Sequence, residues 1–273
     1  VDPKTIELHR PYIDEVHLKC PDCGGTMTRV TEVIDCWFDS GAMPFAQWHY
    51  PFENKENFDE LFPADYICEG IDQTRGWFYS LLAVSTFVTG KSPYKNVLVT
   101  DLVLDKNGKK MSKSKGNTIN PFEMFDKYGA DALRWYLLYV SPPWTPLRFD
   151  EDGLKEIMSK FIGTLKNTYN FFTLYANTDG LNPNDFFVEY KDRPELDRWI
   201  LSKFNNLKKE IEEYLEIFEV NKSIRRMTEF LNDDLSNWYI RRSRRRFWGT
   251  DLTEDKKSVY NTTYEVLRDF CKM

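Results

Sequence analysis

The sequence predicts an α/β region followed by an all-helical region, and three stretches support that prediction. Residues 96–105 (NVLVTDLVLD) form a β-branched apolar run, which is typical of a buried parallel strand. Residues 75–88 (RGWFYSLLAVSTFV) are apolar nearly all round, as in a buried helix. Strand, helix and strand joined by short Gly or Pro turns indicate an α/β layer. From about residue 151 the chain shows helical periodicity with few breakers, which indicates a helical bundle.

The same pattern divides the chain into three zones. Residues 1–34 are a short β-rich segment around Cys-Pro-Asp-Cys-Gly-Gly, where Pro and paired Gly mark a tight turn. Residues 35–150 alternate strand and helix signals and end in a group of prolines. Thr253 before Glu254 suits a helix start in the third zone. That zone, residues 151–273, holds four helical stretches, at 151–177, 195–218, 221–247 and 253–272.

The composition excludes several classes of protein. Of 273 residues, 41% are hydrophobic and 29% charged, which predicts a soluble globular chain. No stretch approaches the ~20 apolar residues of a membrane span, and no signal peptide is visible. Five cysteines, of which only Cys20 and Cys23 are close, predict a reducing compartment, which we take as the cytoplasm. With a net charge of -6, any nucleic-acid contact must rest on local basic patches. The three histidines lie in no recognisable hydrolase triad motif.

A lysine-rich loop, from Asp105 to Asn117, follows the predicted strand. Ammonium groups on a mobile loop suit a polyphosphate, because they can stabilise charge that develops on a leaving pyrophosphate. The alternative is a solvated turn that happens to be rich in lysine. A P-loop is excluded, since Gly-x-x-x-x-Gly-Lys-Ser/Thr does not occur. The five lysines of the loop are Lys106, Lys109, Lys110, Lys113 and Lys115.

A second polar group lies at an expected strand-to-helix turn. Glu69, Asp72 and Gln73 stand among apolar residues, and Gly70 allows the turn. Carboxylates there can bind ribose hydroxyls or a substrate ammonium group, and Gln73 can both donate and accept. Ligands of open α/β sheets lie at the carboxyl ends of the strands. The alternative is a helix N-terminus that acidic residues stabilise.

The spacing of Cys20 and Cys23 is that of half a zinc site. A structural zinc needs four ligands, and the nearest other candidates, Cys36 and His17, are weak ones. The pair therefore predicts a metal half-site that needs further ligands. The alternative is a turn with free thiols.

Five arginines lie within six residues, interleaved with aromatic side chains. Arginine with Trp, Tyr and Phe suits phosphate contacts and base stacking, so the cluster predicts an RNA-binding surface. The alternative is a network of ion pairs between helices. The arginines are Arg241, Arg242, Arg244, Arg245 and Arg246, and the acidic partners expected for such a network are Glu210, Glu212, Glu213 and Glu216.

Several of these strings resemble one family of enzymes. The string from Lys110 to Ser114, Lys-Met-Ser-Lys-Ser, matches the second signature of class I aminoacyl-tRNA synthetases. Residues 69–78 and 35–41 are similar to strings of the isoleucyl-tRNA synthetases, and the valyl and leucyl relatives differ there. Residues 235–248, like Asp-Arg-Trp-Ile-Leu-Ser at 197–202, resemble the start of that family's anticodon-binding domain.

The resemblance implies a fold and a reaction. The fold is the C-terminal half of a Rossmann-type parallel-sheet catalytic domain, in which residues 1–34 end an insertion and residues 35–150 carry the lysine loop. Residues 151–273 would be a truncated helical-bundle anticodon-binding domain. The reaction joins isoleucine to ATP, giving isoleucyl adenylate and pyrophosphate, and then transfers the isoleucyl group to tRNA(Ile). Mg²⁺ is expected with ATP, zinc is expected only in a longer protein, and that parent protein is expected to be a monomer without a membrane segment.

The resemblance also assigns roles to residues. Indole walls suit a branched aliphatic side chain, because they offer a large, rigid apolar area. Such a pocket gains only about 1–3 kcal/mol from one methylene, so rejection of valine would be incomplete. The implied catalytic residues are Lys113 and Lys110, and the implied ATP-binding residues are Lys110, Met111, Ser112, Lys113 and Ser114. The implied adenylate-binding residues are Trp37, Glu69, Gly70, Asp72, Gln73 and Trp77, with the two tryptophans lining the side-chain pocket. The five arginines would contact tRNA.

The sequence departs from the family pattern in places. Thr100-Asp101 stands where many members have His-Gly. The first signature and the editing insertion do not occur in this chain, so we expect that the chain alone does not activate isoleucine. A partner for the Cys20 and Cys23 pair would lie upstream. Two other hypotheses stay open, a valyl- or leucyl-type synthetase and a catalytically silent tRNA-binding module.

Overall fold

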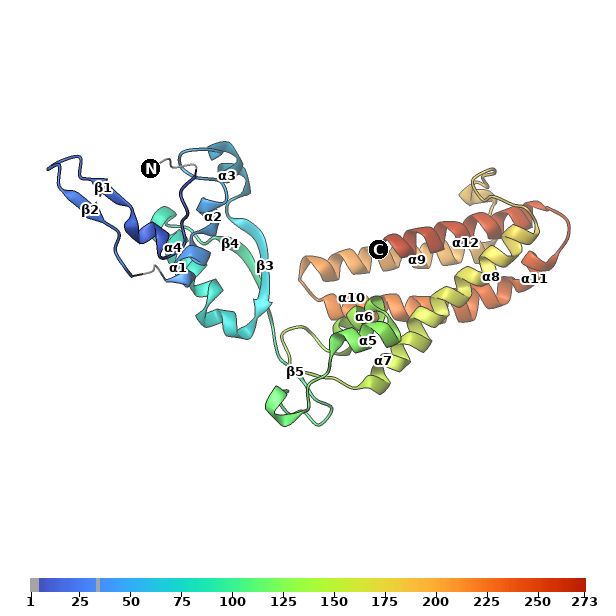
Figure 1. Cartoon of the computed structure of the whole chain (residues 1–273). Helices are drawn as coiled ribbons and strands as arrows, with labels where there is room; N and C mark the ends of the chain where they lie inside the picture. Colours follow the sequence, from blue (N-terminus) through green and yellow to red (C-terminus); the bar gives the residue numbers. More distant parts are fainter. Residues whose placement is uncertain (1–4, 33–34) are drawn as a thin grey trace. The chain divides into compact units, whose positions relative to one another are not determined.

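The computed structural model describes residues 5–32 and 35–273, which fold as two compact units. The first comprises Val1–Ile67 with Asp72–Val97, and the second comprises Cys68–Ile71 with Leu98–Met273 (Figure 1). Within the described residues, no helix is both long and apolar enough to cross a membrane.

The first unit begins with a β-hairpin, as the turn signal predicts. After a 3-10 turn, η1 (Tyr12–Glu15), strands β1 (His17–Lys19) and β2 (Thr26–Thr28) pair antiparallel, with His17 opposite Thr28. The Cys-Pro-Asp-Cys-Gly-Gly turn joins the two strands. The expected end of this zone, residue 34, lies outside the described residues.

Short helices and an aromatic cluster make up the body of this unit. Tyr50 stacks on Phe58 with ring centroids 4.1 Å apart, and Phe58 stacks on Phe62 at 4.7 Å. Asp35 begins the first helix, because its side chain accepts a hydrogen bond of 2.7 Å from the backbone N–H of Trp37. The helices are α1 (Cys36–Gly41), α2 (Met43–Ala46), α3 (Lys55–Leu61) and α4 (Trp77–Thr89).

Helix α4 is the buried helix predicted at residues 75–88, but only one side of it is buried. Phe78 and Leu81 are buried, whereas Phe87 is 92% exposed. The reason is that α1 and α2 pack against one side of the helix. An apolar sequence indicates which sides of a helix can be buried. The elements that pack against the helix determine which sides are buried.

Strands β3 (Ala64–Gly70) and β4 (Tyr94–Thr100) form a two-stranded sheet, with a 3-10 segment, η2 (Ile71–Arg75), and α4 between them in sequence. The backbone N–H of Ala64 donates to the carbonyl of Pro93 at 2.9 Å. The side chain of Asn96 donates to the carbonyl of Asp65 at 2.9 Å. The two strands therefore begin at the same end, as in a strand–helix–strand crossover.

The single buried strand predicted at 96–105 is wrong in two respects. The chain changes partners at Asp101, whose N–H donates to the carbonyl of Pro143 at 2.8 Å. A separate strand, β5 (Val103–Leu104), then pairs parallel with β6 (Leu147–Arg148). The side chains of β4 are exposed or half-buried, because each described sheet has only two strands and is not covered on both faces.

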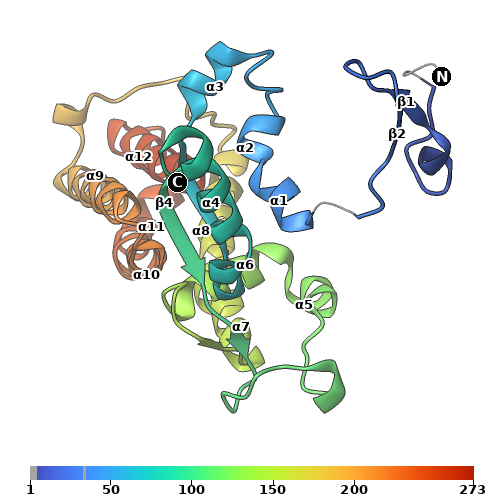
Figure 2. The same ribbon diagram turned by 90° about the vertical axis from the view of Figure 1, so that its left-hand side faces the viewer.

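The second unit continues with helices, as the sequence predicts for residues after about 151. Residues 151–178 form one continuous helical run, and all four predicted helical stretches are helical (Figure 2). The elements before residue 190 are η3 (Lys113–Lys115), α5 (Pro121–Tyr128), α6 (Ala130–Val140), α7 (Glu151–Ile157), the π-helix η4 (Met158–Gly163) and α8 (Thr164–Thr178). The later elements are η5 (Tyr190–Asp192), α9 (Glu195–Glu216), α10 (Val220–Glu229), the π-helix η6 (Phe230–Ile240), α11 (Arg241–Trp248) and α12 (Glu254–Lys272).

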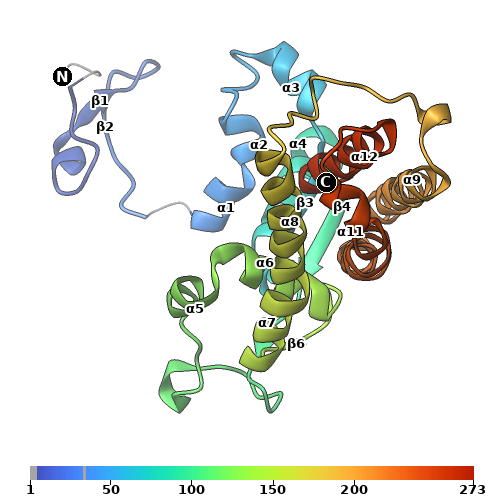
Figure 3. The ribbon, with the colours of Figure 1, turned by 90° about the vertical axis from the view of Figure 1, so that its right-hand side faces the viewer.

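Helix α12 packs against α8, α9 and α11 in a bundle (Figure 3). The helical periodicity predicted for this region has its buried side in α9, where Ile200, Phe204 and Leu207 are at most 1% exposed, whereas Leu215 near the end of the helix is 48% exposed. Asn221 of α10 ties α6 to the bundle by donating to the carbonyls of Leu138 and Tyr139 at 2.9 and 2.7 Å. These are carbonyls at the end of α6 that lack partners within the helix.

One carboxylate, that of Asp197 in the first turn of α9, joins four elements of the bundle. It is completely buried and accepts two hydrogen bonds from Arg246 of α11, at 2.6 and 2.8 Å. The hydroxyls of Tyr239 in η6 and Ser258 in α12 donate to it at 2.8 and 2.5 Å. Burial beside this negative charge raises the pKa of Tyr239 well above its ordinary value, so the phenol stays protonated.

We expect Asp197→Ala to lower the free energy of unfolding by about 3–5 kcal/mol, because it leaves the guanidinium of Arg246 without its buried partner. Asp255→Ala is the matched control, since Asp255 pairs with the same arginine but its side chain is 51% exposed. Its loss should stay below about 1 kcal/mol. Guanidinium unfolding followed by far-UV circular dichroism measures both. Equal losses for the two variants would contradict the central role of Asp197.

Candidate functional site

The lysine loop is closed by a clamp between Asp105 and Asn117. The side chain of Asn117 donates to Asp105 at 2.9 Å and accepts from the backbone N–H of Ser112 at 3.0 Å. The carboxylate of Asp105 also accepts from the N–H groups of Asn107 and Lys109, at 2.9 and 2.8 Å. The hydrogen bond from Asn117, followed by those from the loop backbone, holds the pKa of Asp105 below its ordinary value.

The clamp leaves the lysines of the loop in solvent. Lys110 and Lys113 are exposed, and Lys113 lies in the short turn η3. The hydroxyls of Ser112 and Ser114 are 3.2 Å apart. Met111 differs from its neighbours, because it packs against the hydrophobic core. The loop is therefore held at its two ends and at Met111, while its ammonium groups remain available.

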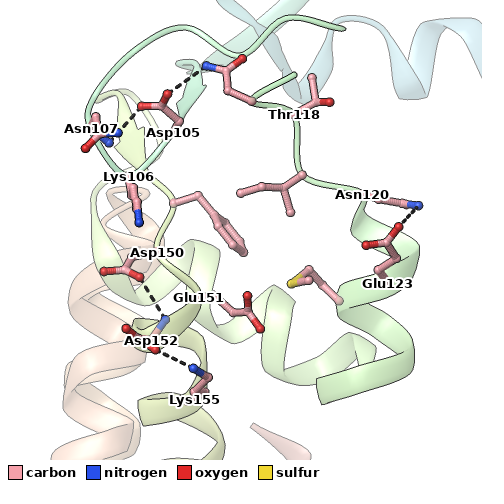
Figure 4. Close-up of a pocket in the computed structure, with 14 residues that line it drawn as sticks. Asp105, Lys106, Asn107, Thr118, Asn120, Glu123, Asp150, Glu151, Asp152 and Lys155 are labelled. Atoms are coloured by element: carbon pink, nitrogen blue, oxygen red, sulfur yellow. Dashed lines mark hydrogen bonds and ion pairs between the residues drawn. The ribbon is translucent and has the colours of Figure 1, made fainter. Parts of the chain in front are cut away.

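A cavity of about 550 Å³ lies beside the loop (Figure 4). Its lysines are Lys106 and Lys155, and not Lys110 or Lys113. The carboxylates that line it, which would repel phosphate, are Asp105, Glu123, Asp150, Glu151 and Asp152. The cavity is thus a poor phosphate site, and the chemistry predicted for the lysines concerns the exposed side of the loop.

The structure brings Trp37, Gln73 and Trp77 together in the first unit. The side-chain oxygen of Gln73 accepts from the N–H of Trp77 at 2.9 Å and so caps α4. The indole N–H of Trp77 donates to the carbonyl of Ser40 at 3.4 Å. A Cβ atom at Gly76 would lie 2.8 Å from the Gln73 oxygen and 3.0 Å from the Trp37 ring. Glycine at this position therefore lets the three predicted residues meet.

The close contact of α1 with α4 fixes where Trp37 lies. A Cβ atom at Gly41 would be 2.7 Å from the backbone carbonyl oxygen of Ser80. Only glycine allows the helices to approach so closely, because that carbonyl belongs to the α4 backbone and cannot rotate aside.

The acidic residues predicted to bind the adenylate, Glu69 and Asp72, lie at the surface. Asp72 is exposed and accepts from the side chain of Gln73 at 3.0 Å. Glu69 is exposed and Gly70 half-buried, at the end of β3. The helix start that we considered as an alternative does exist, but its cap is Gln73 and not a carboxylate.

The two hairpin cysteines form a turn in which Cys20 N–H donates to the carbonyl of Gly25 at 2.8 Å. Hydrogen bonds from the backbone of Cys23 and Asp22 lower the pKa of Cys20, which favours the thiolate that a metal needs. Across residues 5–32 and 35–273, no group of three or more His, Cys, Asp or Glu side chains is placed to hold a metal ion. The pair therefore fits half of a tetrahedral zinc site and does not complete one.

The arginine cluster separates into two kinds of residue. Arg246 points into the bundle and pairs with Asp197 and Asp255, so it has a structural role, and the tRNA contact predicted for it stays a prediction. Burial disfavours the charge of Arg246, but the hydrogen bonds that its guanidinium donates to Asp197 raise its pKa above the ordinary value. The alternative, a network of ion pairs, named Glu210 as a partner of the cluster. Glu210 instead pairs with Arg226 of α10 at 2.6 Å. The exposed members are Arg241, Arg242, Arg244 and Arg245.

The family of the chain follows from comparison with known sequences. Residues 3–150 match the family described as tRNA synthetases class I (I, L, M and V), and residues 197–273 match the anticodon-binding domain of tRNA ligases. The chain belongs to the class I tRNA synthetases of this group.

The relatives in that family include isoleucine–tRNA ligases. The chain is 54% identical to the isoleucine–tRNA ligase of Clostridium novyi over 99% of its own length. It is 52% identical to that of Clostridium acetobutylicum and 54% identical to that of Bacillus thuringiensis, again over 99% of its length. In each case it spans 26% of the relative's length.

Solved structures share the fold. A leucyl-tRNA synthetase of Agrobacterium radiobacter, in a ternary complex with tRNA, aligns with 93% of the chain and 31% of its own, with a TM-score of 0.68 and 20% identity. A methionyl-tRNA synthetase of Mycobacterium tuberculosis, in complex with methionyl-adenylate, aligns with 86% of the chain and 46% of its own, with a TM-score of 0.66 and 19% identity. These neighbours confirm the predicted fold class, a synthetase catalytic fold followed by a helical domain.

Sequence reasoning missed Asp105 and Asn117 as the residues that hold the loop. The available signals were Asp105 two residues before Asn107-Gly108, which favours a side-chain turn, and Asn117 after Gly116. Neither signal predicts that the side chains of Asp105 and Asn117 bind each other across the loop.

We expect Asn117→Ala to raise the Asp105 pKa toward its ordinary value, because the largest interaction with the carboxylate is lost. Since the folded pKa is lowered, the clamp's stabilisation is complete above that ordinary value and is lost as the pH falls through the folded pKa. Carboxyl ¹³C chemical shifts followed against pH measure the change. Thr118→Ala is the control, and an unmoved midpoint in Asn117→Ala would contradict the clamp.

We expect Gly41→Ala to lower the free energy of unfolding by about 1–3 kcal/mol, because the added methyl group forces α1 away from α4. Gly249→Ala is the control, since a Cβ there would meet nothing within 4 Å. Urea unfolding measures both variants. Similar unfolding midpoints for Gly41→Ala and the unaltered chain would show that the helices can separate at no cost.

Proposed function

We propose that the chain is part of an isoleucine–tRNA ligase and supplies the second half of its catalytic site and the start of its tRNA-binding domain. The observation that supports this most directly is the identity of 54% with an isoleucine–tRNA ligase over 99% of the chain. The lysine loop and the indoles of Trp37 and Trp77 are the groups proposed to act on the substrates. The chain spans about a quarter of the relatives' length, so the activity is proposed for a longer protein that contains it.

The proposed reaction has two steps. The carboxylate of isoleucine attacks the α-phosphate of ATP, forming the acyl-phosphate bond of isoleucyl adenylate as pyrophosphate leaves. A terminal ribose hydroxyl of tRNA(Ile) then attacks the acyl carbon, and AMP leaves. Lys113 and Lys110, on the solvent side of the clamped loop, stabilise the charge that develops on the phosphates. Mg²⁺ bound with ATP would shield the same charge.

The amino-acid pocket is proposed to lie at Trp37 and Trp77. Gln73 holds the N-terminus of α4 and so orients Trp77, while the contact of α1 with α4 orients Trp37. Gln73 and Asp72, with Glu69 and Gly70, are proposed to bind the polar groups of the adenylate. The indoles present rigid apolar walls to a branched side chain.

The helical part is proposed to bind tRNA(Ile). Arg241, Arg242, Arg244 and Arg245 are exposed on α11 and suit phosphate contacts. The domain boundaries predicted at residues 34 and 150 are retained as part of this proposal, as are a cytoplasmic location and a monomeric parent. A zinc ion at Cys20 and Cys23 is proposed only with further ligands from the longer protein.

A longer protein that contains this chain and spans the length of its relatives should catalyse ATP–pyrophosphate exchange best with isoleucine. Valine should be poorer by about 10- to 200-fold, the range known for discrimination of one methylene, isoleucyl enzymes included. Leucine should also be poor. Faster exchange with valine or leucine would overturn the assignment in favour of a valyl- or leucyl-type enzyme.

In that protein, Lys113→Ala should reduce exchange by about 10²- to 10³-fold, the loss expected when a transition-state contact is removed. Lys91→Ala, an exposed lysine in the loop after α4, is the control. Unchanged activity of Lys113→Ala would favour the alternative, a catalytically silent tRNA-binding module.

A further inference from the structure

Two neighbouring indole rings lie between two cations across α9, η6 and α11. The ammonium of Lys203 lies 5.9 Å from the ring centroid of Trp199, and the guanidinium of Arg242 lies 4.7 Å from that of Trp238. The two indole rings lie 6.4 Å apart and tilted. These four residues, Lys203, Trp199, Trp238 and Arg242, form what we call the aromatic ladder.

The indole of Trp238 is placed where packing alone would not put it. It is 48% exposed, although the next two residues, Tyr239 and Ile240, are buried in the bundle. A tryptophan presents a large apolar area, and leaving half of it in water forfeits the stabilisation that burial would give. Its contact with the guanidinium offsets that loss only in part, because an exposed cation–π pair contributes little.

Three of the arginines that follow Trp238 on the helix have no acidic partners within residues 5–32 and 35–273. Arg241, Arg242 and Arg245 share one side of α11, because residues three and four apart on a helix are neighbours. Among the described residues, no ion pair involves any of these three arginines. At the far end of the ladder the charge is reduced, since Lys203 pairs with Asp234 at 3.4 Å. The attractive region for an anion is therefore the Trp238 end.

We propose that Trp238 and Arg242 form a stacking platform for an unpaired RNA base, with Arg241 and Arg245 contacting the adjacent phosphates. A flat aromatic face flanked by unpaired cations is the arrangement that binds single-stranded RNA, because every base has a face to stack. Bases within a duplex are already stacked, so the ligand is a loop or an end. The inference rests on the proposed function, in which the partner is tRNA, and adds the contact that reads an unpaired nucleotide.

The test is filter binding of a tRNA(Ile) transcript to the 273-residue chain. Trp238→Ala should weaken binding by roughly 5- to 150-fold, the loss expected for one base–aromatic stack. Trp238→Phe should retain most of the affinity, because phenylalanine still offers a ring. Trp144→Ala is the matched control, since Trp144 is 42% exposed and lies outside the helical bundle. Circular dichroism of each variant establishes that the helices are intact.

A second probe, an RNA duplex without unpaired bases, separates stacking from charge. Trp238→Ala should bind this duplex as the unaltered chain does, whereas Arg241→Ala should weaken binding to both probes. Full tRNA affinity in Trp238→Ala, with weakened binding in Arg241→Ala, would overturn the platform and leave the proposed tRNA contact standing. Failure of the unaltered chain to bind the transcript would instead count against the proposed tRNA-binding role itself.

Discussion

The carboxylate of Asp197 lies where α9, η6, α11 and α12 meet, and the arrangement of the bundle depends on its hydrogen bonds. A buried negative charge is costly unless it is paired and hydrogen-bonded on both oxygens, and here both conditions hold. Because Arg246 must reach this carboxylate, the rotation of α11 about its own axis is set. The same constraint turns the other arginines of the helix outward, so a structural ion pair determines which cations are available to a ligand.

The lysine loop and the tryptophan site are held in place by different kinds of contact. The lysine loop is exposed and is positioned by hydrogen bonds between side chains and its own backbone, with one methionine on the core. The tryptophan site is positioned by a contact between helix backbones. A loop held at its ends can move its cations toward a substrate, whereas walls set by helix packing keep a fixed shape. These properties suit the charge stabilisation and the size selection proposed for the two sites.

Much of the fold could be predicted from the sequence because helices have a local signature. The spacing of Ile200, Phe204 and Leu207 specifies a helix and its buried side without reference to any other element. Burial of an apolar helix such as α4 depends on which elements cover it, and a break in a strand at Asp101 depends on a hydrogen bond to Pro143. Neither the burial of α4 nor the break at Asp101 can be predicted from the periodicity of nearby residues.

In the candidate site, too, local features could be predicted and contacts between separate segments could not. The lysine loop and the tryptophans could be located by their strings, but the clamp of Asp105 with Asn117 and the pairing of Arg246 with Asp197 join residues distant in sequence. Five neighbouring arginines look equivalent in a sequence. Only the fold shows that one of them is already neutralised.

Gly41 has a wider consequence. It faces the backbone of Ser80, and yet the distance between α1 and α4 that it permits decides how far apart the two indoles stand. If the two indoles line the amino-acid pocket proposed above, selection on substrate preference acts on a position outside that pocket, through the spacing of its walls. Divergence among synthetases for related amino acids would then include changes at helix crossings, where a comparison restricted to pocket residues would find nothing altered.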